Sequence, residues 1–173
     1  DAHAYPRELV RKLADLGFFG MRYPEEAGGL GLDLSTFCLA LAEIARGSMS
    51  LAGCAAMQAL MGTKFLQLLG NADILGRLFA PALAGEKIGA ICMTEPDAGS
   101  DVAGMRTMAK PTDDGWVLNG SKMFITNGVR ADYLVLAAKT TTEGGHGGIS
   151  FFFVDTDQPG YEASKIEKLG WHA

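Results

Sequence analysis

The spacing of apolar residues changes at about Gly85, and this change constrains the fold more than any other feature of the sequence. Before Gly85, apolar residues recur every three or four positions, which is the period of an amphipathic α-helix. After it, they gather in short runs rich in Val, Ile, Phe and Tyr, which favour strands. Helices therefore precede strands, without the alternation of a doubly wound sheet. We expect an α+β protein with an all-helical N-terminal domain (1–86) followed by a small antiparallel β-barrel-like domain (87–173).

Four helical segments are expected in the first half of the chain, separated by residues that favour turns. Gly17 ends the first segment, and the glycine-rich stretch 24–31 forms a loop before the second. The third segment is apolar on almost every side, as in a helix that is buried on most faces or lines an apolar cavity. The last three segments are 35–46 with Ser35 as its N-cap, 50–69, and a helix that begins with Asn71 as its N-cap and kinks or ends at Pro81.

Short apolar runs of strand length follow in the second half. The pair Asn119-Gly120 is the strongest short-range indication of a β-hairpin. Residues 116–118 are therefore expected to turn back into a return strand at 123–126. The other expected strands are 88–93, 133–138, 149–154 and 161–166.

Charge and composition argue against several classes of function. A net charge of −5 without a run of like charges argues against nucleic acid as a partner. The longest apolar stretch, 51–62, is far shorter than the roughly 20 residues that a membrane span needs. Three cysteines without a CxxC pair, and three scattered histidines, predict neither a disulfide framework nor a metal site. The pattern fits a reducing compartment, and the charged start of the chain does not resemble a signal peptide.

Residues 92–104, C-M-T-E-P-D-A-G-S-D-V-A-G, offer the most chemistry. A strand breaks at a proline and enters a loop of small residues. Ala98, Gly99 and Ser100 leave their backbone N–H groups uncovered, and consecutive exposed amides form a concavity that suits a phosphate or pyrophosphate. Ser100 adds a hydroxyl donor, and Asp101 can cap the short turn that follows. On these properties alone, a phosphate site and an ordinary Gly-Ser turn both remain open.

This segment resembles, position by position, the first signature of the acyl-CoA dehydrogenase family. At the expected distance, residues 118–128 (LNGSKMFITNG) resemble the family's second flavin-contacting strand, and residues 17–31 and 81–85 resemble the family as well. The resemblance covers nearly the whole chain and implies FAD as the cofactor. The positions that match the fixed residues of the first signature are Thr94, Glu95, Gly99, Ser100 and Asp101.

The resemblance implies roles around FAD for nine residues. The backbone from Ile91 to Thr94, with the Thr94 hydroxyl, would meet the edge of the isoalloxazine ring. Ser100 and its amide neighbours would hold the pyrophosphate, and Ser100 would also contact the acyl-CoA substrate. Phe124 would pack on the flavin, and the Thr126 hydroxyl would lie near N5, where a hydroxyl can stabilise the reduced ring. The expected cofactor contacts are Ile91, Cys92, Met93, Thr94, Gly99, Ser100, Phe124, Ile125 and Thr126.

Several of these residues also have an ordinary structural explanation. Thr94 and Thr126 are common strand residues, and Phe124 would otherwise belong to a core. Glu95 looks able to take up a proton, but it lies beside Pro96. We expect its carboxylate to pair or hydrogen-bond and so hold the loop, not to act as the catalytic base.

No residue of this chain is expected to be the catalytic base. The resemblance implies that in most of the family the base is a glutamate of a C-terminal helical bundle, which follows the β-domain. Residues 168–173 resemble the lead-in to that bundle. We therefore expect the sequence to be the N-terminal and middle parts of a longer enzyme.

The activity that the resemblance implies is FAD-dependent α,β-dehydrogenation of an acyl-CoA thioester. Its partner would be an electron-transfer flavoprotein, the full-length protein would form a homodimer or homotetramer, and its location would be the cytoplasm, or the mitochondrial matrix in a eukaryote. An acyl-CoA oxidase or flavin monooxygenase of the same fold remains open, as does a non-catalytic flavin- or acyl-CoA-binding fragment. The helix at 50–69 would line the acyl pocket, whose chain-length preference the sequence leaves undecided.

Overall fold

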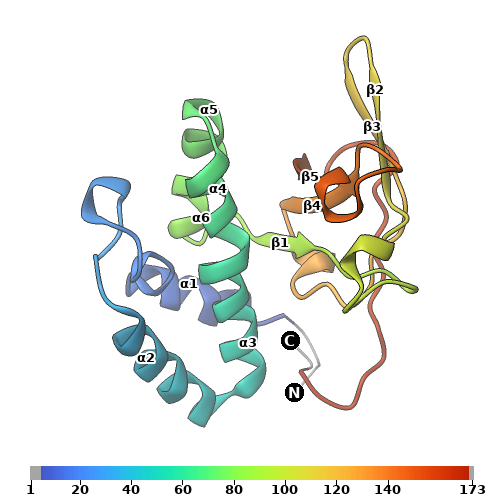
Figure 1. Ribbon diagram of the computed structural model, residues 1–173. Helices are drawn as coiled ribbons and strands as arrows, with labels where there is room; N and C mark the ends of the chain where they lie inside the picture. Colours follow the sequence, from blue (N-terminus) through green and yellow to red (C-terminus); the bar gives the residue numbers. More distant parts are fainter. Residues whose placement is uncertain (1–4, 172–173) are drawn as a thin grey trace.

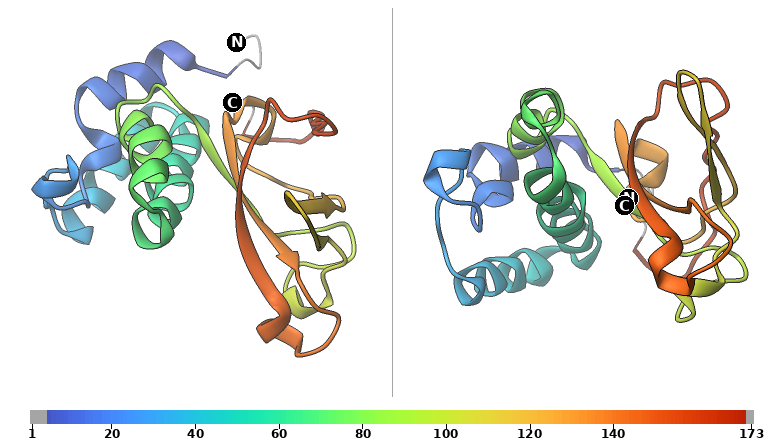
Figure 2. Two further views of the ribbon diagram at one scale, coloured as in Figure 1. Left: turned by 90° about the horizontal axis from the view of Figure 1, so that it is seen from above. Right: turned by 45° about the horizontal axis from the view of Figure 1, so that its top comes forward.

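The computed structural model describes residues 5–171, in which a helical part and a sheet part lie beside each other (Figure 1). Strand β1 (Gly89–Cys92) leads from one part to the other, and two further views show the helices and the remaining strands on opposite sides of this link (Figure 2). The chain is an α+β protein, as its sequence predicts.

The helical part combines α-helices with two π-helical turns. The turn at Gln58–Gly62 joins α3 to α4, and the turn at Leu75–Phe79 joins α5 to α6. Proline lacks an N–H group, and its ring crowds the carbonyl four residues before it, so the helix loses its regular pattern just before Pro81 and then continues to Leu83. The α-helices of the described residues are α1 (Arg7–Asp15), α2 (Leu34–Gly47), α3 (Met49–Met57), α4 (Thr63–Leu69), α5 (Ala72–Ile74) and α6 (Ala80–Leu83).

Side-chain caps fix where three of these helices begin. Asn71 caps α5 by accepting the Ile74 N–H at 3.0 Å, as predicted. The predicted cap of α2 is wrong, because Asp33 and not Ser35 accepts the Thr36 N–H, at 2.8 Å. Asp33 is extended and lies just before the first helical residue, whereas Ser35 already lies in the first turn. Ser48 caps α3 in the same way.

The strands form one mixed sheet in which β4 is central. β4 pairs with β1 in parallel and with β5 antiparallel, and β2 joins it through a single parallel pair. The sheet therefore differs from the purely antiparallel arrangement expected, and within the described chain its order β1-β4-β2-β3 does not close. The long connection from β1 to β4, which includes the β2–β3 hairpin, allows two strands to run in the same direction. The remaining strands are β2 (Met108–Thr112), β3 (Gly115–Asn119), β4 (Tyr133–Lys139) and β5 (Ile149–Asp155).

The hairpin lies one strand earlier than predicted. β2 and β3 turn at Asp113 and Asp114, and this hairpin projects from the rest of the sheet (Figure 1). Residues 123–126, expected as the return strand, have no strand pairing, and neither have residues 161–166. Asp-Asp-Gly has turn chemistry comparable to that of Asn-Gly, so local preference alone does not choose between the two turns.

The main core joins the helices to one face of the sheet. Tyr133 and Val135 of β4 are fully buried among apolar residues of α1, α2, α3 and α4. The other face, with Ala90, Cys92 and Leu134, is covered by Ile125 and Tyr161. β1 and β4 are thus buried on both faces.

The part of the chain that the structure describes contains neither a membrane-spanning helix nor a cluster of metal ligands. No helix within residues 5–171 is both long and apolar enough to cross a bilayer. No three His, Cys, Asp or Glu side chains of these residues gather where they could hold a metal ion. His3 and His172 lie outside the described residues.

Gln58 ties the π turn to the start of the sheet. Its side chain is buried, donates to the carbonyls of Ala82 and Lys87, and accepts the Gly89 N–H at 2.8 Å. Gln58→Ala should lower the free energy of unfolding by about 3 kcal/mol, because the Lys87 carbonyl and the Gly89 N–H lose the side chain that bonds them, while the Ala82 carbonyl keeps the Gly85 N–H. Urea denaturation measures this change. Gln67→Ala, at a partly buried position of α4 where the side chain bonds to Lys64 at the surface, should change it by less than about 0.5 kcal/mol. Equal losses for the two variants would contradict the role of Gln58.

Candidate functional site

The chain that leaves β1 folds into a tight loop. Glu95 and Ala98 form an antiparallel bridge, in which the Glu95 N–H donates to the Ala98 carbonyl at 2.8 Å and the Ala98 N–H donates to the Glu95 carbonyl at 3.3 Å. Asp101 then accepts the Gly104 N–H at 3.2 Å and caps the short helical turn Val102–Gly104, as predicted. The loop is therefore held at both ends by hydrogen bonds within the segment.

The exposed amides of this loop are fewer than the sequence suggests. The Ala98 N–H is already bonded, so it cannot join the expected anion-binding concavity. Gly99 and Ser100 are exposed, and no acceptor within residues 5–171 takes their N–H groups. Two amides and the Ser100 hydroxyl remain as donors that an anion could accept.

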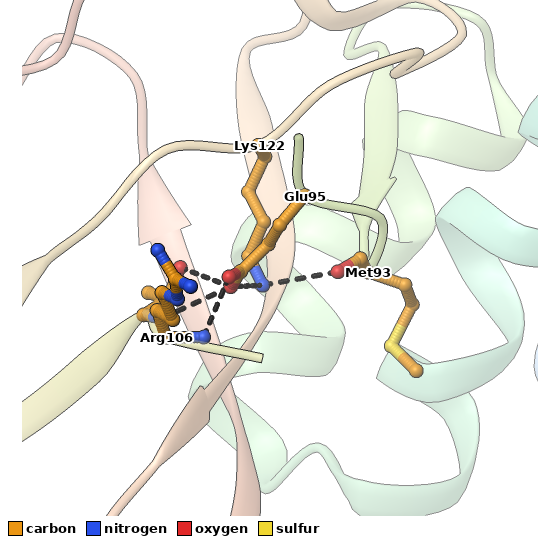
Figure 3. A network of polar contacts seen from close by, with 5 residues as sticks. Met93, Glu95, Arg106 and Lys122 are labelled. Atoms are coloured by element: carbon orange, nitrogen blue, oxygen red, sulfur yellow. Dashed lines mark hydrogen bonds and ion pairs between the residues drawn. The ribbon is translucent and has the colours of Figure 1, made fainter. Parts of the chain in front are cut away.

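The Glu95 carboxylate is the centre of a buried polar network behind the loop (Figure 3). It accepts the Arg106 N–H at 2.6 Å, the Thr107 N–H at 3.0 Å and the Thr107 hydroxyl. The Lys122 ammonium lies 2.8 Å from the same carboxylate. The expectation that Glu95 holds the loop is confirmed.

These contacts keep Glu95 ionised. Burial alone would raise the pKa of its carboxyl, but the hydrogen bonds from Arg106, Lys122 and Thr107 outweigh burial and hold the pKa at about 2. A carboxylate of this kind is a poor proton acceptor near neutral pH, because general bases need a pKa closer to the working pH. The carboxylate of Glu95 therefore has the contacts and the pKa of a structural charge.

The second predicted segment lies directly beside the first. The Met123 N–H donates to the Thr94 carbonyl at 2.8 Å, and the Lys122 ammonium donates to the Met93 carbonyl at 3.1 Å. Residues that are far apart in sequence, 93–95 and 122–123, are thus joined by two direct bonds in addition to the ion pair with Glu95. Residues 121–126 follow this path without belonging to a strand.

Phe124 has an uncommon backbone conformation. Its φ is 59°, and its side chain is 68% exposed. A left-handed conformation costs a residue with a Cβ atom about 1–2 kcal/mol, and such strain gathers at ligand sites. The alternative that Phe124 belongs to a core is wrong, since a core residue is not two-thirds exposed.

Among the other residues predicted to contact the cofactor, four have side chains that pack in apolar clusters. Ile91 packs against the helical core, and Met93 packs beside Ala98. Cys92 and Ile125 belong to the apolar cluster on the other face of the sheet, with Ala90 and Leu134. These four could offer a ligand little more than their backbone. Thr94 and Thr126 are partly buried.

Two residues of the site were missed by sequence reasoning. Lys122 lies between a turn and an apolar run, which gives little sign that its ammonium is buried. Asn127, in the left-handed region with φ 68°, donates to the Cys54 carbonyl of α3 at 3.3 Å. The pair Asn127-Gly128 is a turn sequence, and this could have indicated the conformation but not the contact with α3.

The buried carboxylate should make stability depend on pH in the acid range. The folded pKa of Glu95, about 2, lies below its ordinary value of 4.5, so its contribution is complete above about pH 4.5 and is lost as the pH falls through about 2. Glu95→Gln should cost about 3 kcal/mol at pH 7 and progressively less toward pH 2. Urea unfolding of both proteins from pH 7 to pH 2 checks this. A difference between them that stays constant over that range would show that the charge of Glu95 is not what matters.

Comparisons with known families match both halves of the chain. Residues 1–86 match the family profile described as "Acyl-CoA dehydrogenase, N-terminal domain", and residues 90–173 match "Acyl-CoA dehydrogenase, middle domain". Benzylmalonyl-CoA dehydrogenase of Aromatoleum aromaticum is 58% identical over 171 residues, which is 98% of this chain. The chain spans 45% of the length of that curated relative.

Solved structures agree with the fold. A glutaryl-coenzyme A dehydrogenase in complex with glutaryl-CoA has a TM-score of 0.92 and 37% identity, over 98% of this chain and 44% of that one. An electron transferring flavoprotein structure from Acidaminococcus fermentans has a TM-score of 0.92 and 35% identity, over 99% and 45%. An FAD complex of PigA has a TM-score of 0.85 and 31% identity, over 91% and 42%.

The matched profiles cover nearly the entire sequence, and they meet where the helices end and the strands begin. The chain belongs to the acyl-CoA dehydrogenase family.

Proposed function

We propose that the full-length protein catalyses FAD-dependent α,β-dehydrogenation of an acyl-CoA thioester, with this chain as its N-terminal and middle parts. The observation that carries the proposal is the junction of 93–95 with 122–123, which brings together the two segments expected to border the flavin. The exposed, left-handed Phe124, which follows this junction in the chain, supports it, because strained backbone conformations gather at ligand sites.

The residues present fit an FAD molecule. The amides of Gly99 and Ser100 lack acceptors within the described chain, and an FAD pyrophosphate would accept hydrogen bonds from them. The Thr94 amide likewise has no acceptor there and suits the ring edge. When bound, FAD supplies the acceptor for the hydride that leaves the substrate's β-carbon. The PigA complex, similar in fold, supports FAD in particular.

The other residues that the sequence predicts at the site have the following proposed roles. The backbone of Ile91, Cys92, Met93 and Ile125 would border the ring, and the Thr126 hydroxyl would lie near N5. Ser100 would contact both the pyrophosphate and the acyl-CoA. No residue between 5 and 171 is proposed as the base that removes the α-proton.

The substrate, the electron acceptor and the domain boundaries are also proposed. The similar glutaryl-CoA complex supports an acyl-CoA substrate, and the similar flavoprotein structure supports an electron-transfer flavoprotein as electron acceptor. A homodimer or homotetramer, located in the cytoplasm or the mitochondrial matrix, completes the proposal. The division into domains 1–86 and 87–173 is supported by the end of α6 at Leu83 and the start of β1 at Gly89.

A visible spectrum of the full-length protein tests the function. We expect a flavin absorption band that bleaches when an acyl-CoA thioester is added without oxygen, and the thioester that bleaches it fastest identifies the substrate class. Rapid recovery of the band on admitting oxygen would favour an oxidase over a dehydrogenase. A colourless full-length protein that takes up no added FAD would contradict the proposal.

The role of Ser100 can be tested by removing its hydroxyl. Ser100→Ala in the full-length protein should weaken FAD binding and acyl-CoA binding by about tenfold each, because a hydrogen bond to a charged group contributes roughly 1.5–3 kcal/mol. Equilibrium dialysis of each ligand measures the change. Ser35→Ala, at an exposed position on α2, is the matched control and should leave both affinities unaltered. Unchanged affinities in both variants would refute the contact.

A further inference from the structure

The Lys122 side chain is buried in a way that an ordinary surface lysine is not. Only 8% of it is exposed, and its ammonium contacts the Glu95 carboxylate and the Met93 carbonyl. Taking an ammonium out of water is costly unless it is paired and hydrogen-bonded, so the site is built around this charge. Three other ion pairs of the described chain, such as Lys12 with Glu8, lie on exposed helix surfaces.

The contact with Met93 fixes the direction of a peptide group. In a trans peptide the carbonyl of one residue and the N–H of the next point in opposite directions. Because Lys122 holds the Met93 carbonyl on its own side, the Thr94 N–H must point to the other side. No residue from 5 to 171 accepts a hydrogen bond from this N–H, whereas the Thr94 carbonyl is taken by Met123.

The same lysine is part of the neighbouring segment. Lys122 is followed in the chain by Met123, whose N–H donates to the Thr94 carbonyl, and then by the exposed Phe124. Lys122 therefore contacts the segment that carries the Thr94 donor through its side chain, and belongs by its backbone to the segment that carries Phe124.

We propose that Lys122 is a positioning residue for the flavin: it aims the Thr94 amide at the ring edge and keeps Phe124 beside it. This inference rests on the proposed function. It assigns Lys122 no contact with the flavin, and it distinguishes Lys122 from an ion pair that only stabilises the fold.

The test uses the full-length protein with three variants. Lys122→Met removes the charge but keeps much of the volume. The double variant Glu95→Gln with Lys122→Met leaves no unpaired carboxylate, so it separates the loss of the Met93 contact from the cost of a buried charge. Lys122→Arg retains the charge but replaces a compact ammonium by a planar fork. Lys12→Met removes an exposed, paired lysine of α1 and is the matched control.

Three measurements on each variant are needed: the FAD dissociation constant by flavin fluorescence, the flavin midpoint potential, and the melting temperature of the FAD-free protein. We expect about tenfold weaker FAD binding and a shifted potential in Lys122→Met and in the double variant, partial recovery in Lys122→Arg, and no change in Lys12→Met. If the variants melt earlier but keep wild-type FAD affinity and potential, the inference is overturned. If Lys122→Met fails to fold, the double variant and Lys122→Arg decide by the same criteria. A wild-type protein without flavin affinity would instead refute the proposed function itself.

Discussion

The buried carboxylate of Glu95 organises the candidate site. Its donors come from two places in the sequence: residues 106–107, through two backbone N–H groups and the Thr107 hydroxyl, and Lys122, through its ammonium. A single charge thereby fixes the end of the Gly99–Ser100 loop, the start of β2 and the approach to Phe124. Each donor also offsets part of the cost of burying the carboxylate, so the loss of any one of them leaves part of that cost uncompensated. The loop and the aromatic residue are consequently presented on a rigid support.

A second set of contacts joins this site to the helices. Gln58 bonds to the backbone on both sides of the turn into β1, and the Tyr133 hydroxyl donates to the Gly62 carbonyl at 2.8 Å. Both involve the π-helical turn between α3 and α4, where the regular pattern of helix bonds is interrupted and side chains supply partners. The strand that carries the site is therefore attached to the helical part at the point where the helix is least regular.

Local chemistry was enough to predict much of the fold. The end of α1 at Gly17, the cap at Asn71 and the strands β1, β4 and β5 all follow from signals within a few residues. The parallel pairing of β1 with β4 could not be predicted, since the period of a strand says nothing about the direction of its neighbour. The hairpin was misplaced because two turn sequences compete, and the bond from Met123 to Thr94, which excludes the second, is long-range. The burial of Lys122 depends on a partner 27 residues away.

The bond from Asn127 to the Cys54 carbonyl has a consequence for communication between ligands. It connects the segment beside Phe124 to α3, a helix whose residues Ala52 to Ala55 are buried. A ligand that shifts α3 would therefore also shift the segment beside Phe124, because Asn127 is bonded to Cys54. Because binding energies are linked reciprocally, whatever factor one ligand imposes on the affinity of a second across this bond, the second imposes on the first. One side-chain amide would then make ligands on the two sides of this bond thermodynamically dependent on each other.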